Sequence, residues 1–341
     1  MRVIVAFVAA ALASLPLSVS LAAAADSLGC AVEVVKANRQ RSFAKTVPPG
    51  NYSGVAWLGG SRYAVVSDKS PSDGFFVFDI RIDSVSGKIQ SVYNEGFFSA
   101  ETPNRDQEGI AYVPQVGKVY VSGERGNRVL EYSLDGRHTG RQLAVPDVFA
   151  TAGGNYGIEA LTYNAVTRRF WLTTESTLPC DGQQAAYGNV VGNRLRLQCF
   201  DDSLQPGASF FYEMDLPEVR KRPAAYAMGV SGLCALDDGR LLVMEREFYV
   251  SRRKLGSWVK VKLFAVCPGG CKEGTLLPKT KVMEFKTRLS LFSYRLANYE
   301  GMCLGPRLKD GSRVLLLVSD SQNQYGGVLK DYFRTVVVRC D

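Results

Sequence analysis

The sequence has 341 residues, 46% of them hydrophobic, and its 41 lysine and arginine residues against 33 aspartate and glutamate residues give a net charge of +8. The positive excess is mild and spread along the chain, whereas nucleic-acid-binding proteins concentrate their cations in a patch or stripe. The composition therefore indicates a globular protein without a nucleic-acid partner, although it permits an anionic ligand.

The first 25 residues have the three parts of a secretory signal peptide. Arg2 supplies a positive charge, residues 3–21 are almost wholly apolar or small, and the alanines at 22–25 precede Asp26. We expect cleavage near Ala24 or Ala25 and a secreted or periplasmic mature protein. A membrane anchor is the weaker alternative, because no cationic flank follows the alanines and no later run approaches the roughly 18 apolar residues of a membrane helix.

Five segments share one pattern: a small or acidic residue, a glycine or alanine, an apolar β run, a turn, and a second β run with an acidic residue at its end. The glycine or alanine positions are 51 to 72 residues apart, and a repeat near 50 suits a four-stranded propeller blade. Hardly any amphipathic helical stretch intervenes. The sequence predicts an all-β fold, a β-propeller of five or six four-stranded blades, with first strands at residues 53–57, 108–112, 159–163, 231–235 and 300–304.

Two features modify the repeat. The third and fourth units are longer, and we expect loop insertions at about residues 176–206 and 248–277 within a single domain of residues 26–341. The β runs at residues 31–35 and 331–339 lie near the two ends of the chain. If the first completes the last blade beside the second, the terminal strands close the ring.

All eight cysteines follow the expected signal peptide, and an even number in an exported chain indicates disulfides. One pair would lie at the ends of the terminal strands, one pair within each insertion, and one pair at equal depth on neighbouring inner strands. The expected disulfides are Cys30–Cys340, Cys180–Cys199, Cys267–Cys271 and Cys234–Cys303.

Acidic residues recur at both ends of the strand–turn–strand motif. The first strand runs away from its starting residue and the second returns, so both ends lie on the same side. Because inner strands surround the central channel of a propeller, these residues are expected to ring one channel mouth. The predicted ring, and the candidate metal ligands, are Asp68, Glu108, Glu124, Glu159, Glu175, Glu245, Glu300 and Asp320, with Glu108, Glu159 and Glu300 as candidate catalytic residues.

Eight crowded carboxylates repel one another and must be neutralised. Protons, a metal ion, or the adjacent cations Lys69, Arg125 and Arg246 could neutralise them, and these cations are also candidate substrate-binding groups. Carboxylate oxygens from several directions suit Ca²⁺. The alternative is structural, because acids at strand ends also accept backbone hydrogen bonds or form ion pairs between blades.

The sequence lacks the residue patterns of several other common catalytic sites. The single histidine, His138, lies in the polar segment 135–140 and is expected to be a solvated turn residue. A Ser–His–Asp triad would need it at the channel. No GxSxG elbow, P-loop or HExxH motif occurs. A hydrolase built on this chain should therefore use carboxylates and a metal.

Six segments carry a resemblance to a known family: residues 51–57, 63–70, 106–112, 159–163, 173–179 and 298–302. They resemble the phytase-like family described as having esterase-like activity, and the resemblance spans about residues 50–325. It implies a propeller similar to calcium-dependent propeller phytases, in which acidic residues around the channel hold calcium ions that bind phosphate. The individual phytase ligands do not align residue by residue with this chain.

Three functions remain open. The first is a metal-dependent ester or phosphoester hydrolase that acts on a small, anionic ester, and the second is a lactonase-type calcium propeller acting on a neutral substrate. The third is a non-catalytic binding propeller with structural acids. A charged substrate favours Lys69, Arg125 and Arg246 facing the channel, whereas a binding module favours these cations in ion pairs. We expect a monomer in each case.

Overall fold

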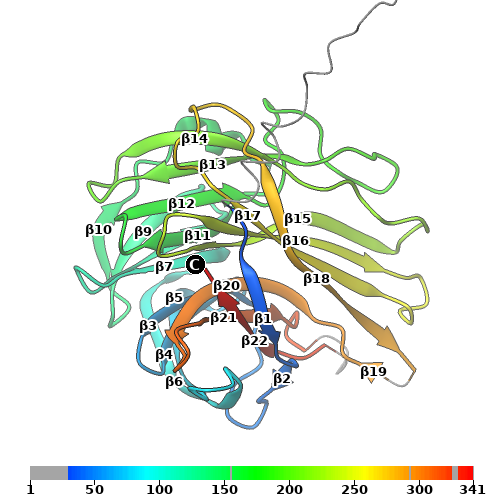
Figure 1. Cartoon of the computed structure of the whole chain (residues 1–341), viewed down its shortest axis with the longest axis horizontal. Helices are drawn as coiled ribbons and strands as arrows, with labels where there is room; N and C mark the ends of the chain where they lie inside the picture. Colours follow the sequence, from blue (N-terminus) through cyan, green and yellow to red (C-terminus); the bar gives the residue numbers. More distant parts are fainter. Residues whose placement is uncertain (1–29, 154–155, 292, 325–328, 341) are drawn as a thin grey trace, which may run out of the picture.

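The computed structural model describes residues 30–153, 156–291, 293–324 and 329–340. These residues form five antiparallel sheets (Figure 1), and the first strand of each sheet contacts the first strands of its two neighbours in a closed ring. The protein is therefore a five-bladed β-propeller, and the described residues hold no sixth blade. The expected signal peptide lies outside the described residues.

Each blade is a meander whose first strand lines the channel. Blade 1 contains β3 (Tyr52–Gly59), β4 (Arg62–Ser67), β5 (Ser72–Ile82) and β6 (Ile89–Pro103), and blade 2 contains β7 (Gln107–Val113), β8 (Lys118–Gly123), β9 (Arg128–Ser133) and β10 (His138–Gln142). Blade 3 contains β11 (Ile158–Asn164), β12 (Arg169–Thr174), β13 (Arg194–Phe200) and β14 (Pro206–Glu213). Blade 4 contains β15 (Ala225–Ala235), β16 (Leu241–Val250), β17 (Trp258–Val266), β18 (Lys279–Ser290) and the short β19 (Ser293–Tyr294).

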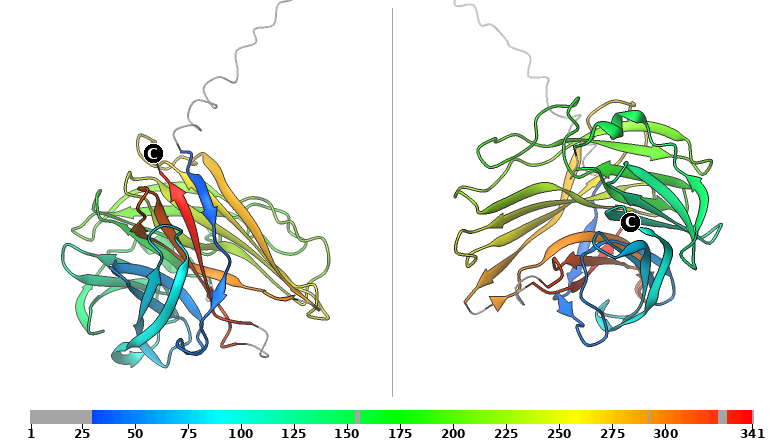
Figure 2. Two further views of the ribbon diagram at one scale, coloured as in Figure 1. Left: turned by 60° about the horizontal axis from the view of Figure 1, so that its bottom comes forward. Right: turned by 180° about the vertical axis from the view of Figure 1, so that it is seen from behind.

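Blade 5 joins the two ends of the described chain. It contains β20 (Asn298–Arg307), β21 (Arg313–Asp320), β22 (Tyr332–Arg339) and β1 (Glu33–Ala37), and β2 (Arg41–Ser42) also pairs with β22. Strand β1 runs antiparallel to β22, and Figure 2 shows the two side by side. That the ring depends on this pairing for closure stays a prediction.

The motif glycines allow the inner strands to approach one another closely. A Cβ atom on Gly54 would lie 2.4 Å from the Glu108 backbone oxygen, and one on Gly301 would lie 2.5 Å from the Ser53 oxygen. A Cβ on Gly109 would lie 2.6 Å from the Leu161 nitrogen. A ring of only five inner strands is narrow, so the repeated glycine keeps neighbouring backbones from colliding.

The blades pack on one another through apolar side chains, with polar pairs at some contacts. His138 lies at such a contact; it is exposed, as expected, but it is the first residue of β10 rather than a turn residue. Its ring centroid is 4.4 Å from that of Tyr132, and its Nε2 is 3.4 Å from Asp73, which is buried and also pairs with Arg105. His138 therefore belongs to a network between blades 1 and 2.

The two expected insertions contain part of the blades. Residues 176–206 include β13, and residues 248–277 include β17, each the third strand of its blade. In blade 3 the additional length lies in the connection of residues 175–193, between β12 and β13. None of the helices in the described residues is both long and apolar enough to cross a bilayer.

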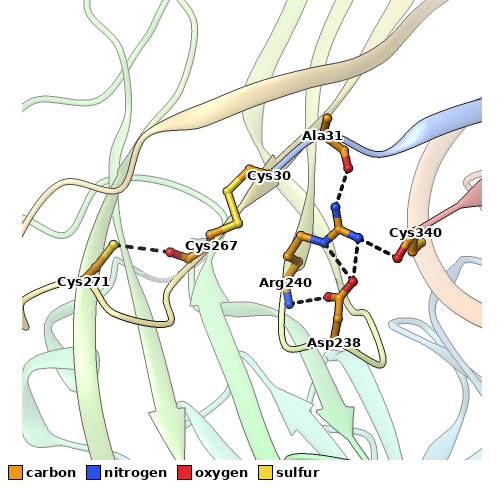
Figure 3. Close-up of a disulfide and its surroundings, with 7 residues drawn as sticks. All are labelled: Cys30, Ala31, Asp238, Arg240, Cys267, Cys271 and Cys340. Carbon is orange, nitrogen blue, oxygen red and sulfur yellow. Dashed lines mark hydrogen bonds and ion pairs between the residues drawn. A yellow bond between two sulfur atoms is a disulfide. The ribbon is translucent and has the colours of Figure 1, made fainter. Parts of the chain in front are cut away.

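The structure contains a disulfide between Cys30 and Cys267, so the expected pairs Cys30–Cys340 and Cys267–Cys271 are wrong (Figure 3). Glu33 pairs with Arg339, and continuing this register places Val32, rather than Cys30, opposite Cys340. Cys271 instead directs its thiol to the Cys267 carbonyl oxygen at 3.3 Å. The disulfide links the segment before β1 to the end of β17, and thus blade 5 to blade 4.

The other two expected disulfides are also wrong. Cys180 is exposed on the blade 3 connection and Cys199 is buried in β13, where it faces Arg169. Cys234 and Cys303 are buried in β15 and β20 as separate thiols. Equal depth on neighbouring strands does not by itself make a disulfide, because the Cα atoms must lie within about 7 Å and the two Cβ atoms must point toward each other.

We expect thiol titration of the denatured, non-reduced protein to find six reactive cysteines, because all but Cys30 and Cys267 are free thiols. Peptide mapping should recover one cross-linked pair, from the segments around Cys30 and Cys267. Finding no reactive thiol, or a Cys30–Cys340 peptide, would contradict this pairing.

Candidate functional site

A β-bulge lies at the motif in the inner strand of every blade, near the start of β3, β7, β11 and β20 and in the middle of β15. The pairing register shifts between Tyr52 and Val55, Gln107 and Ile110, Ile158 and Ala160, Val230 and Gly232, and Tyr299 and Gly301. Bulges bend a strand and redirect a side chain. The bulged residues are Ser53, Glu108, Glu159, Ser231 and Glu300, so three of the five blades place a glutamate at this point of the channel.

The second strand of each blade adds a side chain at the same mouth, and blade 4 differs from the expectation. Asp68, Glu124 and Glu175 lie just past the residues that pair with Tyr52, Gln107 and Ile158, and Asp320 holds the matching place in blade 5. In blade 4, Val230 pairs with Glu245 and Gly229 with Arg246, so the matching residue is Arg246.

Glu245 therefore lies outside the acidic mouth, contrary to the sequence analysis. It points toward blade 3, where it accepts a hydrogen bond from the Tyr212 hydroxyl at 2.6 Å and pairs with Lys279 at 2.7 Å. Successive side chains of a strand point to opposite faces, so one residue of register separates Glu245 from the channel. We call the remaining set the acidic mouth: Asp68, Glu108, Glu124, Glu159, Glu175, Glu300 and Asp320.

The carboxylates of the acidic mouth raise one another's pKa. Burial is the largest cause for Glu108, and Glu159, Glu300, Asp68 and Glu124 add repulsion, so its pKa lies well above the ordinary value. The same two causes raise the pKa of Glu159 and Glu300. Burial likewise raises the pKa of Asp320 to about 7. The acidic mouth therefore favours the protonated form of these carboxyl groups more than water does.

Arg246 supplies the positive charge inside the acidic mouth. Its buried guanidinium forms ion pairs with Glu175 and Glu300 and donates to the Asn298 side-chain oxygen at 3.2 Å. The Asn298 amide in turn donates to Glu300 at 2.7 Å. Glu175 and Glu300 are thus neutralised by the protein itself.

The other two cations lie at the rim. Lys69 contacts Asp68 at 2.9 Å and Asp106 at 3.2 Å, and Arg125 contacts Asp106 at 2.7 Å. Asp106 directly precedes the second motif, in the segment 106–112, but it does not recur in the other blades, which is why the repeat pattern did not select it. All three cations proposed to bind substrate are therefore held in ion pairs.

Glu108 and Glu159 differ from their neighbours. Both side chains are more than nine-tenths buried, yet neither has a hydrogen bond or an ion pair among the described residues. With Glu300 and the motif glycines they line a cavity of about 10 Å³ in the channel. That volume is close to the smallest that holds one water molecule.

The described residues do not fit a calcium site as they stand. Among them, no three histidine, cysteine, aspartate or glutamate side chains are arranged to hold a metal ion. Arg246 takes the charge of Glu175 and Glu300, which leaves Glu108 and Glu159 as unpartnered donors, whereas calcium takes six to eight oxygen ligands. No chemical step is therefore assigned to a metal below.

The opposite end of the channel is mainly apolar. A cavity of about 290 Å³ is lined there by the far ends of the inner strands, including Trp57, Cys234 and Cys303. Burial raises the pKa of Cys234 to about 12 and that of Cys303 well above its ordinary value. Both remain thiols at neutral pH, so neither cysteine supplies a thiolate nucleophile at this end.

These features define a five-bladed β-propeller with an acid-lined channel mouth. The chain belongs to the phytase-like family described as "Esterase-like activity of phytase", whose model matches residues 47–322. No curated protein matches the sequence.

Solved structures with a related architecture are distant in sequence. A streptogramin B lyase structure is 13% identical, with a TM-score of 0.39 over 88% of this chain and 98% of that chain. An endo-arabinase from Bacteroides thetaiotaomicron is 9% identical, with a TM-score of 0.49 over 89% and 99%. A Trichoderma reesei protein of Carbohydrate-Active Enzymes Family AA12 is 8% identical, with a TM-score of 0.45 over 92% and 98%. At these scores the structures carry no argument about function.

Proposed function

We propose that the protein is an exported hydrolase of small esters that acts at the acidic mouth as a monomer. The pair Glu108 and Glu159 carries this proposal, because buried carboxyl groups without partners cost stability and are typical of functional sites. The family description supports an ester substrate. The Cys30–Cys267 disulfide supports an exported location, since disulfides persist in oxidising compartments.

The protonation states suggest how the mouth would work. Burial and mutual repulsion raise the pKa of Glu108 and Glu159, so each holds its proton more tightly than an exposed glutamate does, and one of them would deliver it to the leaving oxygen. Asp320, with a pKa of about 7, can accept a proton from an attacking water. Two carboxyl groups whose environments separate their pKa values can divide the acid and base roles.

The charge of the mouth bears on the substrate. Seven acids and Arg246 leave it negative wherever the acids ionise, and Lys69 and Arg125 are held by acids at the rim. A neutral carboxylate ester or lactone enters such a mouth more easily than a phosphate ester does. A phosphate ester would need a cation such as calcium at the mouth, and Glu108 and Glu159 are the groups that the ion pairs leave available to hold it.

Metal analysis of the purified protein, with hydrolysis of a neutral p-nitrophenyl ester and of p-nitrophenyl phosphate, tests the proposal. We expect the neutral ester to be hydrolysed at the same rate before and after chelation, and the phosphate ester only when calcium is present. Loss of both activities on chelation would show that the mouth needs a metal, and no hydrolysis under any condition would contradict an esterase.

One observation favours a second function, a non-catalytic binding propeller. Lys69, Arg125 and Arg246 are all tied up in ion pairs, as a structural role of the acids requires. In that case the unpartnered Glu108 and Glu159 would bind a cationic or hydroxyl-rich ligand without chemistry. The hydrolysis assays separate the two functions.

A further inference from the structure

Blade 4 extends past the channel mouth. The β15–β16 pairing continues for four residue pairs beyond Gly229 and Arg246, as far as Ala225 and Val250. At about 3.3 Å per residue, this adds roughly 13 Å of sheet beyond the level of the acidic mouth. The strand ends and loops of this blade reach the right-hand side of the molecule in Figure 1. We call residues 218–222, 249–258, 286–291 and 293–294 the blade 4 tip.

A cleft of about 830 Å³ lies in the blade 4 tip, between the segment of residues 218–221 and the strands β16 to β18. Tyr249 and Trp258, paired across the strands, stack with their centroids 5.5 Å apart. The Lys286 ammonium lies 3.8 Å from the centre of the Trp258 ring. The cleft thus has an aromatic floor and cations at its walls.

The cations of the blade 4 tip outnumber its acids. Glu218 is held by Lys260 at 2.6 Å, and Glu247 accepts hydrogen bonds from the backbone of Glu218 and Val219. Burial and the neighbouring Arg288 lower the pKa of Lys286, as expected where cations crowd together. The exposed cations that form no ion pair with a described acid are Arg220, Lys221, Arg222, Arg252, Arg253, Lys286 and Arg288.

Exposed apolar side chains lie among these cations. Leu255 is 43% exposed at the β16–β17 turn, and Leu291 and Tyr294, which follow β18, are 68% and 54% exposed. Leu255 and Leu291 line the same cleft as Arg220 and Lys221. Exposed leucines do not contribute to binding a soluble anion. A lipid surface, in contrast, takes up apolar side chains and attracts cations to its headgroups.

We propose that the blade 4 tip docks the protein on an anionic lipid surface. The leucines and Tyr294 enter the headgroup–acyl boundary, and the arginines and lysines contact lipid phosphates. Because the tip projects past the channel on the same side as Arg246, docking turns the acidic mouth toward the lipid surface. This inference is independent of the chemistry at the mouth.

Flotation of the full-length mature protein with lipid vesicles tests the docking. We expect binding to phosphatidylglycerol vesicles at low salt and at least about tenfold weaker binding to phosphatidylcholine vesicles. The double variant Arg252→Glu/Arg253→Glu should lower the affinity by at least about tenfold, because each cation near an anionic surface contributes roughly 1 kcal/mol. The double variant Leu255→Ser/Leu291→Ser should lower it to a similar extent.

Two controls match these variants elsewhere on the molecule. Lys45→Glu/Lys88→Glu makes the same change in net charge at exposed lysines of other elements, and Val85→Ser/Val166→Ser removes two exposed valines from turns. Both should bind like the wild type. If the wild type does not bind phosphatidylglycerol, or if the leucine variant binds as well as the wild type while soluble polyphosphate competes, the lipid proposal is wrong.

Discussion

Replacing Arg246 with methionine is expected to lower the free energy of unfolding by about 3–5 kcal/mol at pH 8, the usual cost of removing one partner of a buried ion pair. The guanidinium is the only cation inside the acidic mouth among the described residues, and Glu175 and Glu300 lose their partner without it. Chemical denaturation of the variant and the wild type measures the difference.

The cost should depend on pH. Glu300 already has a raised pKa, and losing Arg246 removes the opposing attraction that lowers it. At pH 5 the carboxyl groups take up protons, so the variant should recover part of its stability. Arg125→Met, which removes an exposed ion pair to Asp106, should cost no more than about 1 kcal/mol. Equal losses in the free energy of unfolding for the two variants would contradict the conclusion that Arg246 neutralises the acidic mouth.

Replacing Glu159 with glutamine is expected to stabilise the fold at pH 8, because glutamine keeps the shape of the side chain and removes a charge that burial and neighbouring acids disfavour. The pKa of Glu159 in the folded protein lies well above 4.5, the ordinary value. The folded state therefore holds its proton more tightly than the unfolded state, and the wild type loses stability as pH rises above about 4.5 through the folded-state pKa. The gain of the variant should vanish below that window.

The same substitution at Glu245 is the matched control, because it is also a buried glutamate. Glu245 is bonded to Tyr212 and Lys279, so Glu245→Gln should destabilise the protein by breaking a satisfied pair. Opposite signs for the two variants are the expected result of denaturation at pH 8. A destabilising Glu159→Gln would show that Glu159 has a partner, such as a metal ion, that the protein chain does not supply.

Much of the fold follows from the sequence because the repeat fixes it. The five motif glycines or alanines mark the five inner strands, and the residues beside them reach one channel mouth. The bulge at each of these positions was not visible in the sequence, since a bulge depends on how two strands pair. The alternation of strand residues still placed Glu108, Glu159 and Glu300 together.

The incorrect site prediction arises where a shift of one residue in the strand pairing changes which side chain faces the channel. In blade 4 the distance from Ser231 to Glu245 is 14 residues, against 15 or 16 in the first three blades, and Arg246 restores the spacing of 15. The sequence analysis selected Glu245 because it is acidic, whereas the spacing of the other blades selects Arg246. The cysteine pairs failed for a related reason, because a disulfide depends on how neighbouring blades meet, and the sequence pattern describes each blade separately.

The central claim is that the acidic mouth hydrolyses esters, with Glu108 or Glu159 as the acid and Asp320 as the base. Its most direct test is the kcat for a neutral p-nitrophenyl ester in the wild type, Glu108→Gln, Glu159→Gln and Glu245→Gln, each shown to be folded by its melting curve. We expect at least about a hundredfold loss in whichever of Glu108→Gln and Glu159→Gln removes the acid, the usual contribution of general acid–base catalysis, and a near wild-type rate for the folded Glu245→Gln. Unchanged hydrolysis in both Glu108→Gln and Glu159→Gln would contradict the account.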